Sequence, residues 1–358
     1  MKKKKRKIFK IIAGFIILLV IAGVCLCFYL VSPVSSDSVI VNFKIEKNTS
    51  VKDIVKNLKD SNLIRNEQFT ILYYKINDFG SLNAGSYELN QNMSLREIFN
   101  TLSDMDSLNN ESIRMTFHEG KNIRNYAKII AKNTDYTEED VINKVNDKEY
   151  LKKLISKYWF LTDKILDDSI YYPLEGYLAP DTYEFNKDAT LEDIFNKLLD
   201  EENTKLEKYK SKLNENNIHN YLTLASIAEL EGNNSDNRKN IVGVFVNRIN
   251  NNIPLGSDVT TYYANKIDMG DRDLTYEEII DENPYNTRPL SSAGKLPIGP
   301  ICNPSIESID AVINYTPNNY FYFVADKEGN IYFNETEDGH VQTINELQEK
   351  GLWFEYEE

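Results

Sequence analysis

The chain has 358 residues, of which 41% are hydrophobic and 11% aromatic. That is enough apolar material for one or two packed cores, which excludes a disordered polymer. The formal net charge is −14, and seven cations lie within the first ten residues, so the remainder carries −21. A body with that charge repels nucleic acid, and we expect no nucleic-acid partner.

The first residues predict a membrane anchor. Residues 1–10 form a basic tail, and residues 11–31 are continuously apolar without a charge. At about 1.5 Å per residue, a helix of this length spans a hydrocarbon core of ~30 Å. The basic cluster favours a cytoplasmic N-terminus, which places the following residues outside the cell membrane. A cleaved signal peptide is the alternative, but residues 32–36 give no clear A-x-A cleavage site.

A short polar stalk, residues 32–38, leads into a small α+β pattern over residues 39–105. Residues 39–45 predict a strand because they are rich in β-branched and aromatic side chains. Ser50 with Asp53 forms a capping pair that predicts the start of a helix.

Three further elements complete this first pattern. Residues 66–76 predict a second helix and residues 85–89 a short strand. Ser94 with Glu97 is a capping box that predicts a third helix. The polar stretch 103–111 follows, and we place the domain boundary there.

The order of strand and helix then recurs. Residues 113–120 predict a strand and residues 123–130 a helix, with a glutamate and a turn between them, as in residues 43–58. We interpret this as a second, degenerate copy of the first pattern. Residues 106–170 are accordingly assigned to a connecting α+β subdomain, and residues 171–358 to the catalytic domain.

From residue 171 onward, short strands and Pro/Gly loops are expected between two strong helical patterns. The helices are predicted over residues 221–231 and 237–250. Residues 320–325 and 331–334 flank a turn and predict a hairpin near the end of the chain.

Histidine is too scarce and too dispersed for a local metal site. His118, His219 and His340 are the only three, and they form no H-E-x-x-H motif. No G-x-S-x-G elbow, P-loop or dinucleotide-binding glycine pattern stands between a strand and a helix. We therefore expect no metal or other cofactor, and carboxylate chemistry remains.

Glu229 is the candidate acid. It lies in a predicted helix among small and apolar neighbours, so burial should raise the pKa of its carboxyl. A carboxyl that holds a proton near neutral pH can donate it to a glycosidic oxygen. Glu231 is two residues further on and points elsewhere on a helix. For a lone glutamate in a helix, an ordinary surface residue is the alternative.

An ordered set of motifs resembles the endolytic murein transglycosylase family, also called MltG or YceG-like. The matching residues are 175–183, 225–231, 244–248, 255–260 with 262–263, 284–287, 294–301 and 322–326. Residues 84–87 and 94–97 resemble the LysM-like subdomain that this family carries after its anchor. The resemblance implies an α+β fold with an N-terminal transmembrane helix, a small LysM-like module and a larger α+β catalytic domain.

The same resemblance implies a reaction. Glu229, at the position of the family's glutamate, would protonate the leaving oxygen of the MurNAc–GlcNAc β-1,4 bond and then remove the C6 hydroxyl proton. The product would be a 1,6-anhydro-MurNAc end, and cleavage of nascent strands would end their elongation. Ordinary glycosidases need two carboxylates, whereas here the sugar's own hydroxyl attacks and one suffices.

Polar groups are still needed to orient the glycan and to stabilise the developing charge. The candidates lie on loops or strand ends within or beside these motifs: Asp258, Thr260, Tyr285, Asn286, Thr287 and Asn334. For each of them, a purely local structural role is the alternative.

The expected partners are peptidoglycan glycan strands, the plasma membrane and, by resemblance, peptidoglycan synthases. Two other functions remain open. One is a membrane-anchored glycan-binding protein without catalysis, and the other is a hydrolase of the lysozyme type that leaves reducing MurNAc ends.

Overall fold

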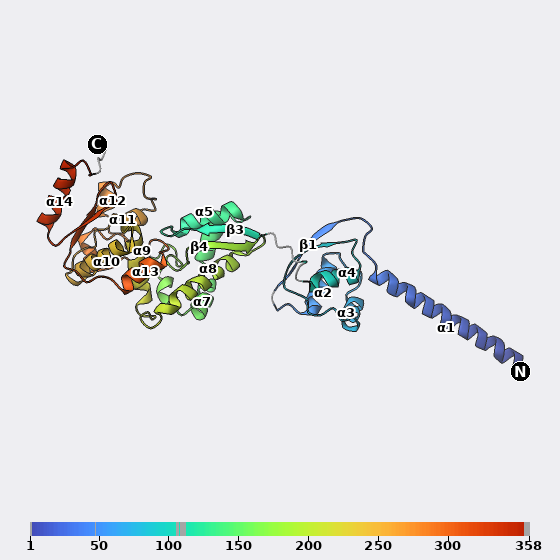
Figure 1. The fold of residues 1–358 in the computed structure, drawn as a ribbon. Helices are drawn as coiled ribbons and strands as arrows, with labels where there is room; N and C mark the ends of the chain where they lie inside the picture. Colours follow the sequence, from blue (N-terminus) through green and yellow to red (C-terminus); the bar gives the residue numbers. More distant parts are fainter. Residues whose placement is uncertain (1, 47, 105–106, 108–111, 354–358) are drawn as a thin grey trace. The chain divides into compact units, whose positions relative to one another are not determined.

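The structure is a computed structural model that describes residues 2–46, 48–104, 107 and 112–353 (Figure 1). The chain divides into two compact units, Met1–Glu111 and Ser112–Glu358, and each has its own hydrophobic core. Both units combine helices with antiparallel strand pairs, which confirms the expected α+β class. The division falls at the end of the polar stretch 103–111.

Unit 1 begins with helix α1, Lys2–Val31. Its segment Gly14–Val31 has a mean hydropathy of 2.9, and none of this segment is buried in protein. Such a helix can cross a bilayer because its backbone polar groups bond within the helix. Among the residues that the structure describes, α1 is the one helix long and apolar enough to do so, which is consistent with the anchor predicted over residues 11–31.

The rest of unit 1 is a strand pair covered by helices (Figure 1). Strand β1 (Ile40–Ile45) pairs antiparallel with β2 (Gly85–Asn90), and Phe43 lies opposite Tyr87. Both aromatic side chains enter the core, since alternate residues of a strand face the same side. The helices are α2 (Val51–Asp60), α3 (Glu67–Ile76) and α4 (Leu95–Ser103). We call β1, α2, α3, β2 and α4 the first module.

The helix starts predicted for the first module are confirmed. Ser50 Oγ accepts the Asp53 amide at 3.2 Å, and Ser94 and Glu97 form a reciprocal capping box. Each cap satisfies backbone N–H groups that have no partner inside the helix. The local sequence therefore determines where these helices begin.

Unit 2 opens with the same order of elements. Strand β3 (Ser112–Phe117) pairs antiparallel with β4 (Asp181–Asn186), and Met115 lies opposite Tyr183. The helices are α5 (Ile123–Asn133), α6 (Glu138–Val145) and α8 (Leu191–Leu206). We call β3, α5, α6, β4 and α8 the second module. Its strand β3 precedes the boundary expected at residue 170, and its strand β4 follows it.

The two modules also agree in sequence and backbone conformation. Residues 87–90 read Tyr-Glu-Leu-Asn and residues 183–186 read Tyr-Glu-Phe-Asn. After the first strand of each module, the chain turns through a residue with positive φ, Asn48 at 65° and Gly120 at 69°. These matches support the hypothesis of a degenerate copy and extend it to β4 and α8.

One segment has no counterpart in the first module. Between α6 and β4, residues 146–180 form helix α7 (Lys148–Lys157), a 3-10 turn η2 (Asp163–Leu166) and a buried loop. Tyr172, Leu174, Tyr177 and Leu178 of this loop belong to the main core of unit 2. The insertion thus joins the second module to the rest of the unit.

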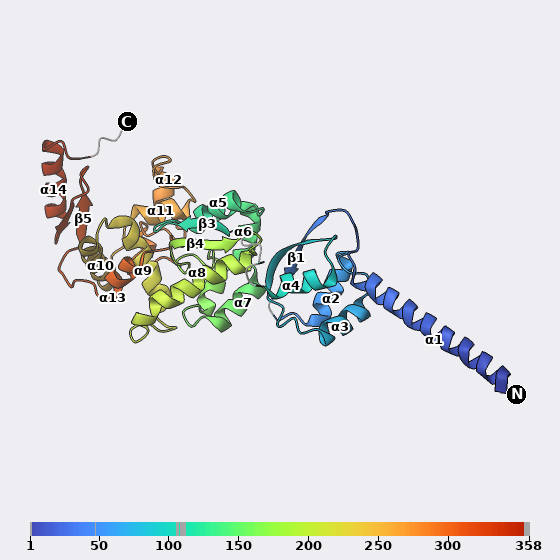
Figure 2. The ribbon, with the colours of Figure 1, turned by 45° about the vertical axis from the view of Figure 1, so that its right-hand side comes forward.

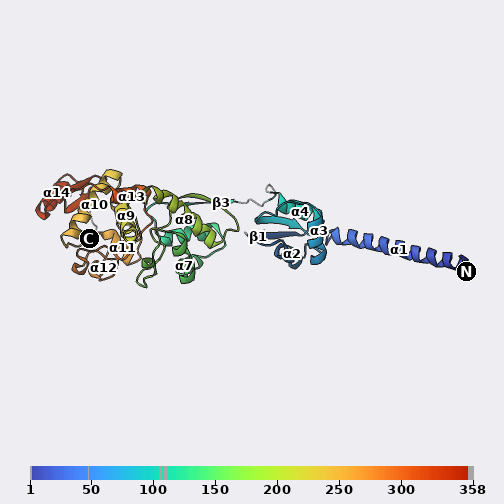
Figure 3. The ribbon, with the colours of Figure 1, turned by 90° about the horizontal axis from the view of Figure 1, so that it is seen from below.

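The remainder of unit 2 is mostly helical (Figure 2). Its elements are η3 (Glu207–Tyr209), α9 (Ile218–Glu231), α10 (Ser235–Asn250), α11 (Asp258–Ala264), α12 (Tyr276–Ile280), η4 (Leu290–Ser292), α13 (Ile306–Ile313), β5 (Tyr322–Ala325), β6 (Ile331–Asn334) and α14 (Glu337–Glu349). Helix α9 packs against α10, α11 and α13, and Figure 3 shows α13 beside α10.

The two helices and the hairpin expected in this region are confirmed. The expectation that the remaining residues form short strands and loops is only partly met. Helices α11, α12, α13 and α14 are too short or too weakly amphipathic to be recognised from periodicity.

Candidate active site

Helix α9 carries the glutamate motif from the core to the surface. Residues 222–228 are all buried, so the helix is surrounded by protein on every side. Ser226 fixes its position, because Ser226 Oγ accepts the Ile301 amide at 3.0 Å. The helix ends at Gly232, where an added Cβ would lie 2.5 Å from Arg238 Cγ. Glu229, Leu230 and Glu231 therefore lie at a tightly packed helix end.

The Glu229 carboxylate is held by donors on both oxygens. Arg238 Nη2 lies 2.8 Å from Oε1, while the Ser305 amide and the Ser308 hydroxyl donate to Oε2 at 2.9 and 2.6 Å. The Ser305 hydroxyl adds a fourth bond of 2.5 Å, and the side chain is only 7% exposed. A guanidinium and a backbone amide can only donate, so both oxygens of Glu229 act as hydrogen-bond acceptors here.

The Glu231 carboxyl has a different environment. It accepts one hydrogen bond, from Ser257 Oγ to Oε1 at 2.5 Å, and forms no ion pair within the described part of the chain. Burial raises the pKa of Glu231; the Ser257 hydrogen bond opposes this, and the nearby Asp258 carboxylate adds to it. The residue nevertheless remains partly exposed. The guanidinium groups of Arg288 and Arg248 also oppose the rise in the pKa, so Glu231 combines a raised pKa with partial exposure.

Several of the predicted substrate-binding residues support the loop that carries Ser257. Thr287 Oγ1 accepts the Ser257 amide at 3.2 Å and lies 2.8 Å from Thr260 Oγ1. Asn286 Oδ1 accepts a hydrogen bond from Thr261 Oγ1 at 2.8 Å, and the side-chain Nδ2 of Asn286 donates to three backbone carbonyls. All are buried, so their hydrogen bonds go to protein rather than outward.

The other predicted residues lie in three places. Asp258 is the first residue of α11, is half exposed and pairs with Arg288 beside Glu231. Tyr285 is fully buried against Tyr263 and accepts the Tyr171 amide at 3.3 Å. The third, Asn334, ends strand β6, and its Oδ1 accepts a hydrogen bond from Thr343 in α14. Asp258 is the predicted residue that the structure brings to the surroundings of Glu231.

A buried carboxyl, Glu175, joins the second module to the rest of unit 2. Both of its oxygens accept the Ile123 amide at 3.1 Å, and Tyr263 donates at 3.0 Å. Burial raises the pKa of Glu175 to about 8, although these hydrogen bonds oppose the shift. Asn303 donates to the same carboxyl at 3.3 Å, and its Oδ1 accepts the amides of Gly176 and Leu178 at 2.9 and 3.1 Å.

This network places the turn after β3 beside helix α9. The Gly120 amide donates to Asn303 O at 3.0 Å, and the Asn303 amide donates to Lys121 O at 3.0 Å. A Cβ on Gly120 would lie 3.2 Å from Leu230 Cδ2 and 3.6 Å from Glu229 Cγ. Glycine therefore allows both the positive φ and the close approach.

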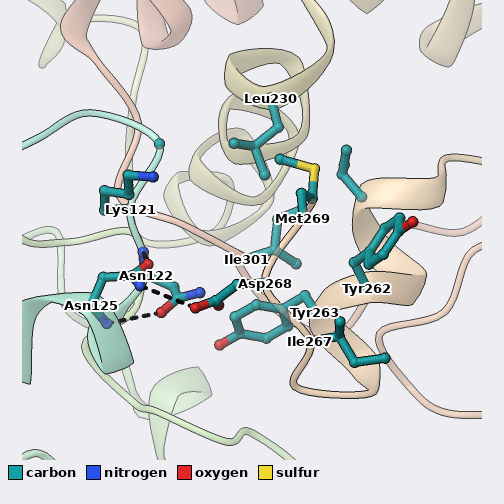
Figure 4. Close-up of a pocket in the computed structure, with 12 residues that line it drawn as sticks. Lys121, Asn122, Asn125, Leu230, Tyr262, Tyr263, Ile267, Asp268, Met269 and Ile301 are labelled. Atoms are coloured by element: carbon teal, nitrogen blue, oxygen red, sulfur yellow. Dashed lines mark hydrogen bonds between the residues drawn. The ribbon is translucent and has the colours of Figure 1, made fainter. Parts of the chain in front are cut away.

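A pocket opens between this turn and helix α11 (Figure 4). Its lining residues are Gly120, Lys121, Asn122, Asn125, Leu230, Val259, Tyr262, Tyr263, Ile267, Asp268, Met269 and Ile301. Among the described residues, no group of three or more His, Cys, Asp or Glu side chains could hold a metal ion. The pocket borders Leu230, between the two glutamates of the motif.

Sequence reasoning missed the partners that distinguish the two glutamates. Arg238 lies in α10, Ser305 is the N-cap of α13 and Ser308 lies in α13, and no spacing rule connects them to Glu229. Ser257 stands inside a recognised motif, but its hydrogen bond to Glu231 depends on the tertiary fold.

Comparison with known proteins places this chain. The model of the YceG-like family matches residues 43–346. The chain belongs to the YceG-like family. It is 32% identical to the endolytic murein transglycosylase of Bacillus subtilis (strain 168), over 90% of this chain and 88% of that protein. It is 28% identical to the protein of the same name from Streptococcus pneumoniae serotype 2, over 86% of this chain and 58% of that protein.

A solved structure agrees with this family. The crystal structure of a putative yceG-like protein from Listeria monocytogenes matches with a TM-score of 0.60 and 30% identity, over 86% of this chain and all of that one. The prediction that the chain is a lytic transglycosylase of this family is confirmed at the level of the family.

Proposed function

We propose that this YceG-like protein is an endolytic transglycosylase that cleaves the MurNAc–GlcNAc β-1,4 bond of nascent glycan strands. The supporting observation is a partly exposed glutamate, Glu231, whose pKa is raised by burial at the end of helix α9. The names of the relatives from Bacillus subtilis and Streptococcus pneumoniae agree with it. Cleavage inside nascent strands would end their elongation.

We assign the acid to Glu231 rather than to Glu229. An acid must hold a proton before the reaction and be reachable by the substrate. The oxygens of Glu229 face a guanidinium and a backbone amide, whereas Glu231 has one hydroxyl partner and a free oxygen within the described residues. Glu229 then acts as a positioning residue that connects α9 to Arg238 of α10 and Ser305 before α13.

The proposed reaction uses one carboxyl twice. Glu231 gives its proton to the glycosidic oxygen as the C1–O4 bond breaks, and the GlcNAc hydroxyl leaves. The resulting carboxylate accepts the proton of the MurNAc C6 hydroxyl as O6 bonds to C1, which forms the 1,6-anhydro ring and restores the acid. No water is consumed. Ser257, which donates 2.5 Å from Oε1, would stabilise the carboxylate between the two steps.

A pair of isosteric variants tests this assignment. In Glu231→Gln the proton donor is lost, so anhydro-ended products from purified sacculi should fall by about 10²-fold or more while the thermal midpoint stays near that of the wild type. Glu229→Gln should instead lower the thermal midpoint, because an amide nitrogen would face Arg238 or the Ser305 amide, and should keep measurable cleavage.

Other results would favour a different acid or a different function. A folded Glu229→Gln variant without activity, beside an active Glu231→Gln variant, would return the acid role to Glu229. Unchanged glycan strands with the wild-type protein would favour the glycan-binding alternative. Products heavier by one water, with reducing MurNAc ends, would identify a hydrolase.

We infer that α1 anchors the protein in the cell membrane with its N-terminus in the cytoplasm, and that the first module is a LysM-like glycan-binding module. The support is an apolar helix preceded by a basic tail, and a two-stranded sheet covered by helices. Such a tether would keep the active site near newly made strands and the synthases that produce them. Digestion of the region after residue 32 by an external protease, in cells with intact membranes, tests the orientation.

A further inference from the structure

The pocket beside helix α9 is lined by polar side chains, and one of them, Lys121, makes no ion pair or hydrogen bond with any described residue. Its polar lining includes Asn122 and Asn125, which form the capping box of α5. Asp268 is occupied as well, because it lies 2.8 Å from Arg124 and 3.7 Å from Lys128. Buried or paired groups of this kind serve the fold.

Lys121 is different. Its side chain is exposed, and it makes no ion pair or hydrogen bond with any described residue. Figure 4 shows it at the rim of the pocket, to the left of Leu230. In a body that carries −21, an unpaired cation beside the reactive helix is available for a negatively charged ligand.

The backbone of Lys121 is fixed although its side chain is free. Its carbonyl accepts hydrogen bonds from the amide and the Nδ2 of Asn303 at 3.0 and 3.2 Å. The preceding Gly120 packs against Leu230. The ammonium group therefore extends from a fixed backbone position beside Leu230, the residue that precedes Glu231.

Opposite Lys121, the pocket has an apolar wall. Leu230 and Met269 lie close together there, and Met269 is half exposed (Figure 4). A small apolar group that carries a carboxylate fits this combination of methyl-lined wall and cation. In a peptidoglycan strand, the muramoyl residue has such a group: its lactyl arm bears a methyl, and either the arm itself or the attached stem peptide bears carboxylates.

We infer that Lys121 binds a carboxylate carried by the muramoyl residue next to the cleaved bond, either on the stem peptide of a nascent strand or on the free lactyl arm of a denuded strand. Leu230 and Met269 contact the methyl of that lactyl arm. Lys121 thereby lets the enzyme recognise muramoyl residues and reject uncharged glycans. This inference rests on the proposed function and names the feature of the substrate that the pocket reads.

The test compares three soluble strands: denuded strands with free lactyl carboxylates, strands that carry an L-Ala–D-Glu dipeptide, and the same dipeptide strands with every carboxyl amidated. Lys121→Gln should raise KM about tenfold on a charged strand, leave kcat nearly unchanged, and have no effect on the amidated strand. Lys121→Arg should restore most of the affinity. A larger effect on denuded strands assigns the lactyl carboxylate, and a larger effect on dipeptide strands assigns the stem peptide.

The matched control is Lys132→Gln, which removes an exposed lysine at the far end of α5, away from the pocket lining. It should leave KM unchanged on all three strands. Equal losses on charged and amidated strands, or equal losses in the two glutamine variants, would overturn the inference. Binding of the same strands to the Glu231→Gln variant, read by calorimetry, separates recognition from catalysis, so a failure of the proposed reaction would not hide this result.

Discussion

In the first module, Asn48 turns the chain after β1 and stays exposed, whereas in the second module Gly120 makes the same turn against Leu230 of helix α9. The two modules share strand register, element order and capping positions. The second differs by the insertion 146–180, which carries Glu175 and ties the module to Asn303. The same arrangement of elements thus has its own core in unit 1, whereas in unit 2 it packs against helix α9 and would line the proposed active site.

The largest difference between the two modules is expected from substitutions at equivalent core positions. Phe99 and Phe195 occupy the same place in the two modules and are both fully buried. Phe→Ala at either should cost about 3–5 kcal/mol because it leaves a cavity. Phe99→Ala should lower the melting temperature of unit 1 alone. Phe195→Ala should lower both the melting temperature of unit 2 and the turnover rate. Scanning calorimetry and cleavage of soluble strands measure both, and a loss of turnover in Phe99→Ala would contradict the distinction.

The next largest difference should be in how the stability of the two units depends on pH. In unit 2, burial raises the pKa of Glu175 and of Glu202 to about 8. Among the described residues of unit 1, the buried polar side chain is Thr70, which has no group that titrates in this pH range. Each folded pKa lies above the unfolded value, so the stability it contributes is complete below pH ~4.5 and is lost as the pH rises toward 8.

Unit 2 should accordingly lose about 1 kcal/mol of stability per pH unit for each of these groups between pH 5 and 8. In Glu202, Oε1 has no hydrogen-bond partner, so Glu202→Gln should flatten this slope without disturbing a network. Denaturant melts at several pH values measure it. Equal slopes for the variant and the wild type would show that Glu202 does not titrate in this range.

The smallest effect concerns the turn itself. Gly120→Ala should cost about 1–2 kcal/mol from its positive φ and should also displace Leu230, which lies 3.2 Å from the new Cβ. Asn48→Ala should cost about 1 kcal/mol and leave turnover unchanged, because its surroundings are open. Asn48→Gly is the matched control and should be close to neutral. Comparable losses of turnover at Asn48 and Gly120 would remove the proposed difference between the turns.

Local signals predicted much of the first module and part of the second. The capping pairs at Ser50 and Ser94 are encoded within a few residues, and so were found. The pairing of β3 with β4 was not, because the insertion 146–180 separates them and neither strand carries a turn signal toward the other.

The candidate site shows the same limit. The sequence and its family resemblance located the motif that contains Glu229 and Glu231, but could not tell their environments apart. That difference comes from Arg238, Ser257 and Ser305, which lie on separate elements and meet only in the folded chain. Position on the helix indicates where a carboxyl points, while its proton affinity depends on neighbours that are distant in sequence.

The side chain of Asn303 has a consequence for how the enzyme is made. It bonds to segments near residues 121 and 176, so the turn after β3 acquires its final partner only after nearly the whole chain has been synthesised. Contacts between such remote segments form late and slow the folding of a domain. A newly made chain would therefore pass through an interval in which its first module is folded while the proposed active site is not yet assembled. A chain truncated before Asn303 would not cleave peptidoglycan.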